Sequence, residues 1–106
     1  MGVVDVDRDV LGVKRGKAGL SNSGVKSGDA LIKTGTSSVY WLSISDTAAL
    51  SIELNNSTDN SGTDLWAAVL PVGCYAHFIF DPPIEFSAGI YLDVSTVTCK
   101  AVVGYI

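Results

Sequence analysis

From residue 30 onward, apolar and polar residues alternate with a period of two. The stretch IYLDVS places Ile90, Leu92 and Val94 on one side of an extended chain, and the alternation around Leu50 and Ile52 is equally regular. A period of two is typical of a β-strand with one buried face. No segment shows the helical period. The sequence therefore predicts an all-β fold.

The alternation and its interruptions predict about eight short strands. They cover residues 30–34, 38–46, 48–55, 65–70, 74–80, 84–86, 90–95 and 97–105. Asp81-Pro82-Pro83 is expected to end one strand, because neither proline can donate a hydrogen bond to a neighbour. Short strands with closely spaced turns indicate an antiparallel β-sandwich, either jelly-roll-like or Ig-like.

The chain of 106 residues is long enough for one domain. Residues 1–29 contain six glycines and no sustained period, which disfavours both helices and long strands. We therefore expect an extended N-terminal arm, residues 1–29, that lies on a partner, followed by a β-sandwich domain, residues 30–106.

Charge differs between these two parts. Residues 1–29 have a balance of +1 and residues 30–106 a balance of −5. The cations of the arm, which we predict to bind a partner, are Arg8, Lys14, Arg15, Lys17 and Lys26. They have no aromatic residues among them for stacking on bases, so nucleic-acid binding is not expected. An acidic protein surface is the better partner.

Candidate catalytic groups are few. His77 is the only histidine, and no nucleophile or orienting acid is evident for it. Cys74 and Cys99 fall on core-facing positions without zinc-site spacing, and two separate buried thiols are favoured over a disulfide. The acidic loop STDNSGTD lacks the spacing of a calcium site. We expect no enzymatic activity, no cofactor and no metal.

Several apolar or aromatic residues fall on the face away from the predicted core. With only 17% charged residues, a soluble monomer would have difficulty covering its surface. Surplus aromatic residues on an outer face are typical of protein–protein interfaces. The predicted oligomer interface consists of Val39, Trp41, Trp66, Tyr75, His77, Ile79 and Tyr91.

The beginning of the sequence lacks a secretory signal, and its longest apolar runs are too short to span a bilayer. We therefore expect a protein made in a cytoplasm that does not bind a membrane.

Residues from about 30 to 105 resemble a group of small phage virion proteins. The resemblance is carried, in order, by LIKTGTSSVYWLSIS, LSIELNNSTDNSGTDLW, PPIEFSAGIYLDVS and TCKAVVGYI. It implies a capsid cement or decoration protein of a tailed phage, which binds the major capsid protein at the capsid surface as a homo-oligomer, a trimer. It implies no catalytic residues, and residues 1–29 lie outside it.

An alternative is a receptor-binding or carbohydrate-binding module of a phage tail fibre or tail tip. Trp41 or Trp66 would then stack on sugar rings. The polar partners would be Asn55, Asn56, Asp59 and Asn60.

Overall fold

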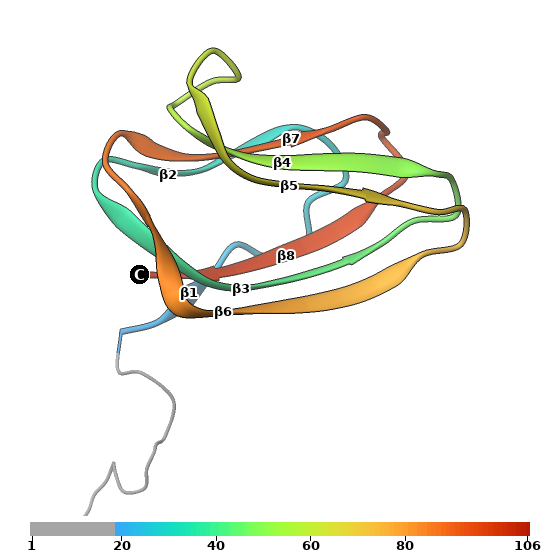
Figure 1. The fold of residues 1–106 in the computed structure, drawn as a ribbon, viewed down its shortest axis with the longest axis horizontal. Helices are drawn as coiled ribbons and strands as arrows, with labels where there is room; N and C mark the ends of the chain where they lie inside the picture. The colour runs from blue at the N-terminus through green and yellow to red at the C-terminus, as the bar shows by residue number, and fades with distance from the viewer. Residues whose placement is uncertain (1–18) are drawn as a thin grey trace, which may run out of the picture.

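Residues 19–106, the part of the chain that the computed structural model describes, form eight β-strands and no helix (Figure 1). The strands are β1 Ser21–Asn22, β2 Ala30–Thr34, β3 Ser37–Ser45, β4 Leu50–Asn56, β5 Thr63–Leu70, β6 Tyr75–Phe86, β7 Gly89–Val94 and β8 Lys100–Tyr105. The predicted all-β class is confirmed.

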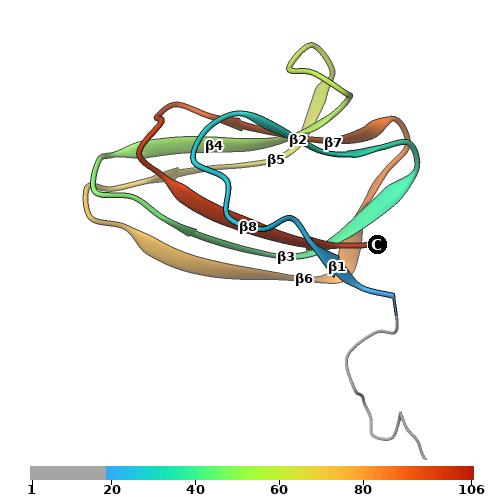
Figure 2. The same cartoon turned by 180° about the vertical axis from the view of Figure 1, so that it is seen from behind.

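The strands form two sheets that pack face to face (Figures 1 and 2). Sheet A has the order β1-β8-β3-β6, sheet B has the order β2-β7-β4-β5, and every pair is antiparallel. The pairs β1–β8, β2–β7, β3–β6 and β4–β5 are those of one long hairpin rolled into a sandwich. This is the topology of an eight-stranded jelly roll, and it excludes the Ig-like alternative.

The core lies between the sheets. Leu42 and Ile44 of β3 face Leu50, Ile52 and Leu54 of β4 across it, and all five side chains are at most 1% exposed. The same core contains Phe86, Ile90, Leu92, Val94, Cys74, Cys99, Ala101 and Val103. Both cysteines are free thiols. Burial of this apolar area is the main stabilisation of the fold.

The faces of β3 reverse at Tyr40. Relative to β8, the register shifts by one residue between Val39 and Trp41, so Tyr40 is the extra residue of a β-bulge. Each residue of a strand faces the side opposite to the residue before it, so one extra residue moves the preceding side chains to the other face. Val39 therefore points into the core and is completely buried. Its predicted place on the outer, interface-forming face is wrong.

Strand β6 continues through Asp81, Pro82 and Pro83, where the sequence predicted an interruption. The strand forms the edge of sheet A, so one of its sides needs no hydrogen-bonding partner and prolines are tolerated there. Residues 80–83 of β6 lie opposite Tyr40 alone. The ladder between β3 and β6 is therefore irregular at this point.

The sandwich begins earlier than predicted. Residues 19–29 were expected to belong to the arm, but β1 pairs with β8 at the edge of sheet A. The backbone N–H and C=O of Lys26 bond to Ala101, and Oδ1 of Asp29 accepts the N–H of Val94 at 2.8 Å. Of the predicted arm cations, only Lys26 is in the described part of the chain. Arg8, Lys14, Arg15 and Lys17 lie outside it.

Candidate functional site

The outer face of β6 carries large side chains that nothing in the described subunit covers. Ala76 and Phe78 of this strand point toward the core, so Tyr75, His77 and Ile79 point outward. Tyr75 is 80% exposed and Ile79 is 73% exposed. The sequence placed these three residues on the outer face, and the structure agrees. Their role in an interface stays a prediction.

Trp41 joins this face from β3. It pairs with Ile79 of β6 on one side and with Gly104 of β8 on the other. Its indole ring lies over Gly104, where a glycine leaves room for it. The ring of His77 is 5.7 Å away, centroid to centroid, and tilted by 36°. Trp41 is thus half-buried and held between two neighbours while one part of it remains accessible.

The orientation of His77 is fixed from β3. Its Nδ1 and the hydroxyl of Ser43 share a hydrogen bond of 2.5 Å. In the described residues, no carboxylate bonds to the His77 ring, so the pair lacks the orienting acid of a serine–histidine catalytic arrangement. The expectation of no enzymatic activity stays a prediction.

The irregular ladder between β3 and β6 opens into a groove beside Trp41. Its volume is about 470 Å³. The side chains that line this sheet A groove are Tyr40, Trp41, His77, Ile79, Phe80, Asp81 and Pro83. Two aromatic residues, Tyr40 and Trp41, and one carboxylate, Asp81, therefore lie together in the lining of this groove. Tyr40, Asp81 and Pro83 were not among the predicted site residues, because the two prolines were interpreted only as the end of a strand.

Trp66 does not belong to the outer face. Its ring lies between the sheets, 4.9 Å from the ring of Phe78 and 5.5 Å from that of Phe80, centroid to centroid, in edge-on contacts. Such contacts are favourable for aromatic pairs in a core. The predicted position of Trp66 on the outer face is wrong, because the core-facing residues of β5 include it. Its role in an interface stays a prediction.

Tyr91 lies on the outer face of sheet B, opposite Leu31 of β2 and Asn55 of β4. It is therefore on the other side of the sandwich from Trp41 and Tyr75. The residues predicted as one interface are divided between two faces, and only those on β3 and β6 form a continuous surface.

The outer face of sheet B carries a row of carboxylates. Asp93 and Glu53 are direct neighbours on β7 and β4. The pKa of Glu53 is raised mainly by the nearby carboxylate of Asp64. The pKa of Asp93 is raised mainly by burial and, after that, by the carboxylate of Asp29. Within the described residues, no group of three acidic, histidine or cysteine side chains is arranged to hold a metal ion.

The polar residues proposed for sugar binding lie near this row. Asn55 is buried, and its amide nitrogen donates to Gly62 O at 2.9 Å and to Asp64 Oδ1 at 2.8 Å. Asn56 bonds to Ser87, so both amides hold local structure. The structure does not bring them together with Trp41.

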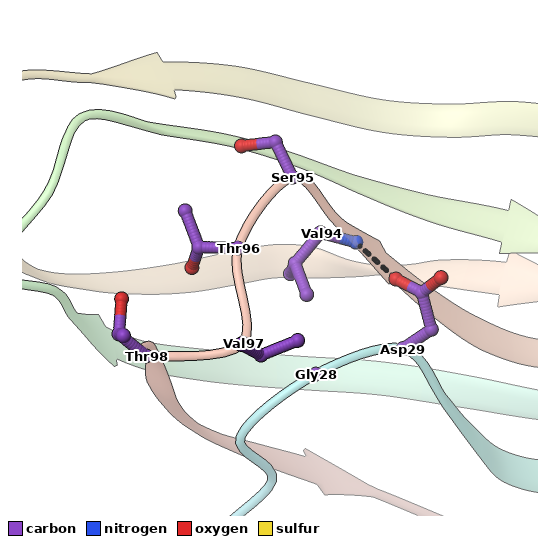
Figure 3. Close-up of a pocket in the computed structure, with 7 residues that line it drawn as sticks. All are labelled: Gly28, Asp29, Val94, Ser95, Thr96, Val97 and Thr98. Carbon is purple, nitrogen blue, oxygen red and sulfur yellow. Dashed lines mark hydrogen bonds between the residues drawn. The ribbon is translucent and has the colours of Figure 1, made fainter.

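A larger hollow lies at one end of the sandwich, between the chain before β2 and the turn after β7 (Figure 3). Its volume is about 710 Å³. Its lining consists of Gly28, Asp29, Val94, Ser95, Thr96, Val97 and Thr98. The one charged side chain among them, Asp29, points toward Val94 and accepts a hydrogen bond from its backbone N–H. This hollow therefore has less recognition chemistry than the smaller sheet A groove.

No known protein family, curated protein or solved structure matches the chain. The described residues contain no helix that is long and apolar enough to cross a membrane. The site must therefore be interpreted from its own geometry.

Proposed function

We propose that this protein is a structural component of a tailed-phage particle, of the cement or decoration type, which binds the major capsid shell as a homo-oligomer. The observation that supports the proposal best is the exposed row of Tyr75 and Ile79 on β6, next to Trp41. Partly apolar patches of this kind on a rigid sheet are typical of interaction sites. Tyrosine and tryptophan are the residue types enriched at the centres of interfaces.

The fold is compatible with this role. Eight-stranded jelly rolls occur in viral capsid proteins and in lectins. The described residues carry eight carboxylates against three lysines, which favours a partner with a basic surface. In a trimer, the same weak contact would be made three times on one shell, and binding would strengthen through effective concentration.

The test combines native mass spectrometry of the full chain with co-sedimentation on purified capsid shells that lack the protein. We expect an oligomer that binds shells. The double variant Tyr75→Ser, Ile79→Ser should lose shell binding or oligomerisation without unfolding, as judged by circular dichroism. Val69→Ser is the matched control, because Val69 is 81% exposed on the outer side of sheet B.

A monomer that does not sediment with shells would contradict the proposal. Deletion of residues 1–18 removes most of the predicted arm and keeps residues 19–106, which contain all the described strands. If the arm contacts the shell, the truncated chain should stay folded and lose shell binding.

The second candidate is a carbohydrate-binding module of a tail fibre or tail tip. One observation favours it: an accessible indole beside a carboxylate, Trp41 with Asp81, in the sheet A groove. Glycan-array binding that disappears in Trp41→Ala and persists in Trp66→Phe would support it over the shell-binding role.

A further inference from the structure

The sheet A groove combines aromatic rings with a single type of charge. Tyr40 and Trp41 are aromatic residues of its lining, whereas the ring of Phe80 packs against Trp66 on the core side, and Asp81 is the only carboxylate in the lining. None of the described cations, Lys26, Lys33 and Lys100, lines the groove. A second carboxylate, Glu85, lies farther along the same strand and accepts a hydrogen bond from Ser38. This end of the outer face is therefore aromatic and anionic.

We propose that the sheet A groove binds an arginine side chain on a basic segment of the partner protein. This inference rests on the proposed function and specifies the chemistry of its partner. A guanidinium group is attracted to the face of an indole ring, and tryptophan is the most favourable aromatic partner for a cation. The same group forms strong charge-assisted hydrogen bonds to a carboxylate, which Asp81 supplies. Residues 30–106 have a net negative charge, which also favours a basic partner segment.

The groove is organised before a ligand arrives. Trp41 is supported by Gly104 from below and by the ring of His77 from the side. His77 is in turn held by Ser43. The opening itself results from the register, since residues 80–83 of β6 lie opposite one residue of β3. Preformed sites lose little side-chain entropy on binding, so a single anchor residue can contribute substantially.

A neutral sugar is the main competing ligand, since it can also stack on Trp41. A pocket orients a neutral ligand through a small number of precisely placed polar groups beside its apolar lining. Here the amides of Asn55 and Asn56 are on the other sheet and engaged locally. An isolated carboxylate among aromatic rings fits a cation better.

The test uses the full chain and two peptides, acetyl-GRGRG-amide and the same peptide with citrulline in place of arginine. Citrulline keeps the shape of the side chain and removes its charge. Binding is followed by isothermal titration and by the indole N–H signal of Trp41 in nitrogen-15 NMR spectra. We expect the arginine peptide to bind about tenfold more tightly than the citrulline peptide and to shift the Trp41 signal.

Asp81→Asn should weaken binding of the arginine peptide by about tenfold, which corresponds to about 1.4 kcal/mol. Glu85→Gln is the matched control: it removes a carboxylate from the same strand but outside the groove, and binding should change less than about twofold. Trp41→Ala should abolish binding, and the melting temperature of each variant shows whether it is folded.

Equal affinity for both peptides, no binding of either peptide, or unchanged affinity in Asp81→Asn would overturn the inference. Binding of chitotriose at Trp41 without binding of the arginine peptide would also overturn it, in favour of a sugar site. The proposed function can fail separately. If Tyr75→Ser, Ile79→Ser abolishes shell binding but Asp81→Asn does not, the function stands and the arginine site falls. If the peptide binds through Asp81 but the protein does not bind shells, the site stands and the function falls.

Discussion

The indole of Trp41 occupies the space in which a side chain on Gly104 would lie. A Cβ atom on Gly104 would be 2.1 Å from both Cε2 and Nε1 of Trp41. The two residues are direct neighbours on β3 and β8, so a side chain on Gly104 would displace the ring. Gly104 therefore provides the space for the ring of Trp41, a lining residue of the sheet A groove.

Gly104→Ala should displace the Trp41 ring and destabilise the protein by about 1–3 kcal/mol, the usual cost of overpacking. Urea unfolding measures the loss, and Trp41 fluorescence should shift in the native state. Gly28→Ala is the control, because the nearest atom to its new Cβ would be Val97 Cγ1 at 4.0 Å. Unchanged stability in Gly104→Ala would show that the Trp41 ring can adopt another position without loss of packing.

Trp66 and Tyr75 should respond in opposite ways to truncation. Trp66→Ala removes a ring packed against Phe78 and Phe80 and should cost about 3 kcal/mol of unfolding free energy. Tyr75 is 80% exposed, so Tyr75→Ala should change stability by less than about 0.5 kcal/mol and affect only association. Thermal unfolding and native mass spectrometry of the two variants separate these effects. A large loss of stability in Tyr75→Ala would contradict this division.

Asp46 joins the loop after β3 to the turn before β8. Its carboxylate accepts the hydroxyls of Thr96 at 2.5 Å and Thr98 at 2.7 Å and the backbone N–H of Ala48 at 3.0 Å. These hydrogen bonds, that of Thr96 first, hold the pKa of Asp46 below its ordinary value. Because the unfolded state binds the proton more readily, this stabilisation is present above the ordinary pKa and is lost as the pH falls through the folded pKa.

Asp46→Asn should therefore destabilise the protein at pH 7, and the difference from the natural chain should shrink in acid. Urea unfolding at neutral and acidic pH measures both effects. Thr58→Val, in the exposed loop between β4 and β5, serves as the control and should behave like the natural chain at both pH values. A difference that is independent of pH would contradict the role of the ionised carboxylate.

Glu53 and Asp93 should show the opposite dependence on pH. Their raised pKa values mean that the folded state binds protons more readily than the unfolded state. Their unfavourable contribution to stability is therefore absent in acid, and it grows as the pH rises from their ordinary pKa values through the folded ones. Glu53→Gln should stabilise the protein at pH 7 by about 0.5 kcal/mol, the usual size of a like-charge cross-strand contact. Glu85→Gln removes a carboxylate outside this row and should not stabilise the protein. A loss of stability in Glu53→Gln would show that the Glu53 carboxylate has a favourable partner.

The strands were predictable because half-buried strands leave a period of two in the sequence. Leu50, Ile52 and Leu54 are in the core as expected, and the outward residues of β6 were placed correctly. Val97 is an exception: it continues the alternation of Cys99 and Ala101 in sequence, but it lies in a turn and is 82% exposed. The period alone does not show where a strand begins.

Two of the errors have a clear physical cause. The bulge at Tyr40 has no signature in the residue pattern, since Tyr40 and Val39 suit either face of a strand, so the burial of Val39 could not be read from the alternation. The proline pair was interpreted as a break because the position of β6 at a sheet edge depends on the topology. The sheet A groove arises where these two features meet, and for that reason the sequence did not reveal it.

The nested pairing of the jelly roll also bears on how the chain reaches its native state. The β4–β5 pair needs only residues 50–70, whereas each further pair encloses the one before it, up to β1–β8. Contacts between distant residues close late, because the entropy of loop closure opposes them. Strand β8 lies inside sheet A, between β1 and β3. During synthesis, sheet A therefore cannot be completed until residues 100–105 have left the ribosome, and β1 has no partner before then.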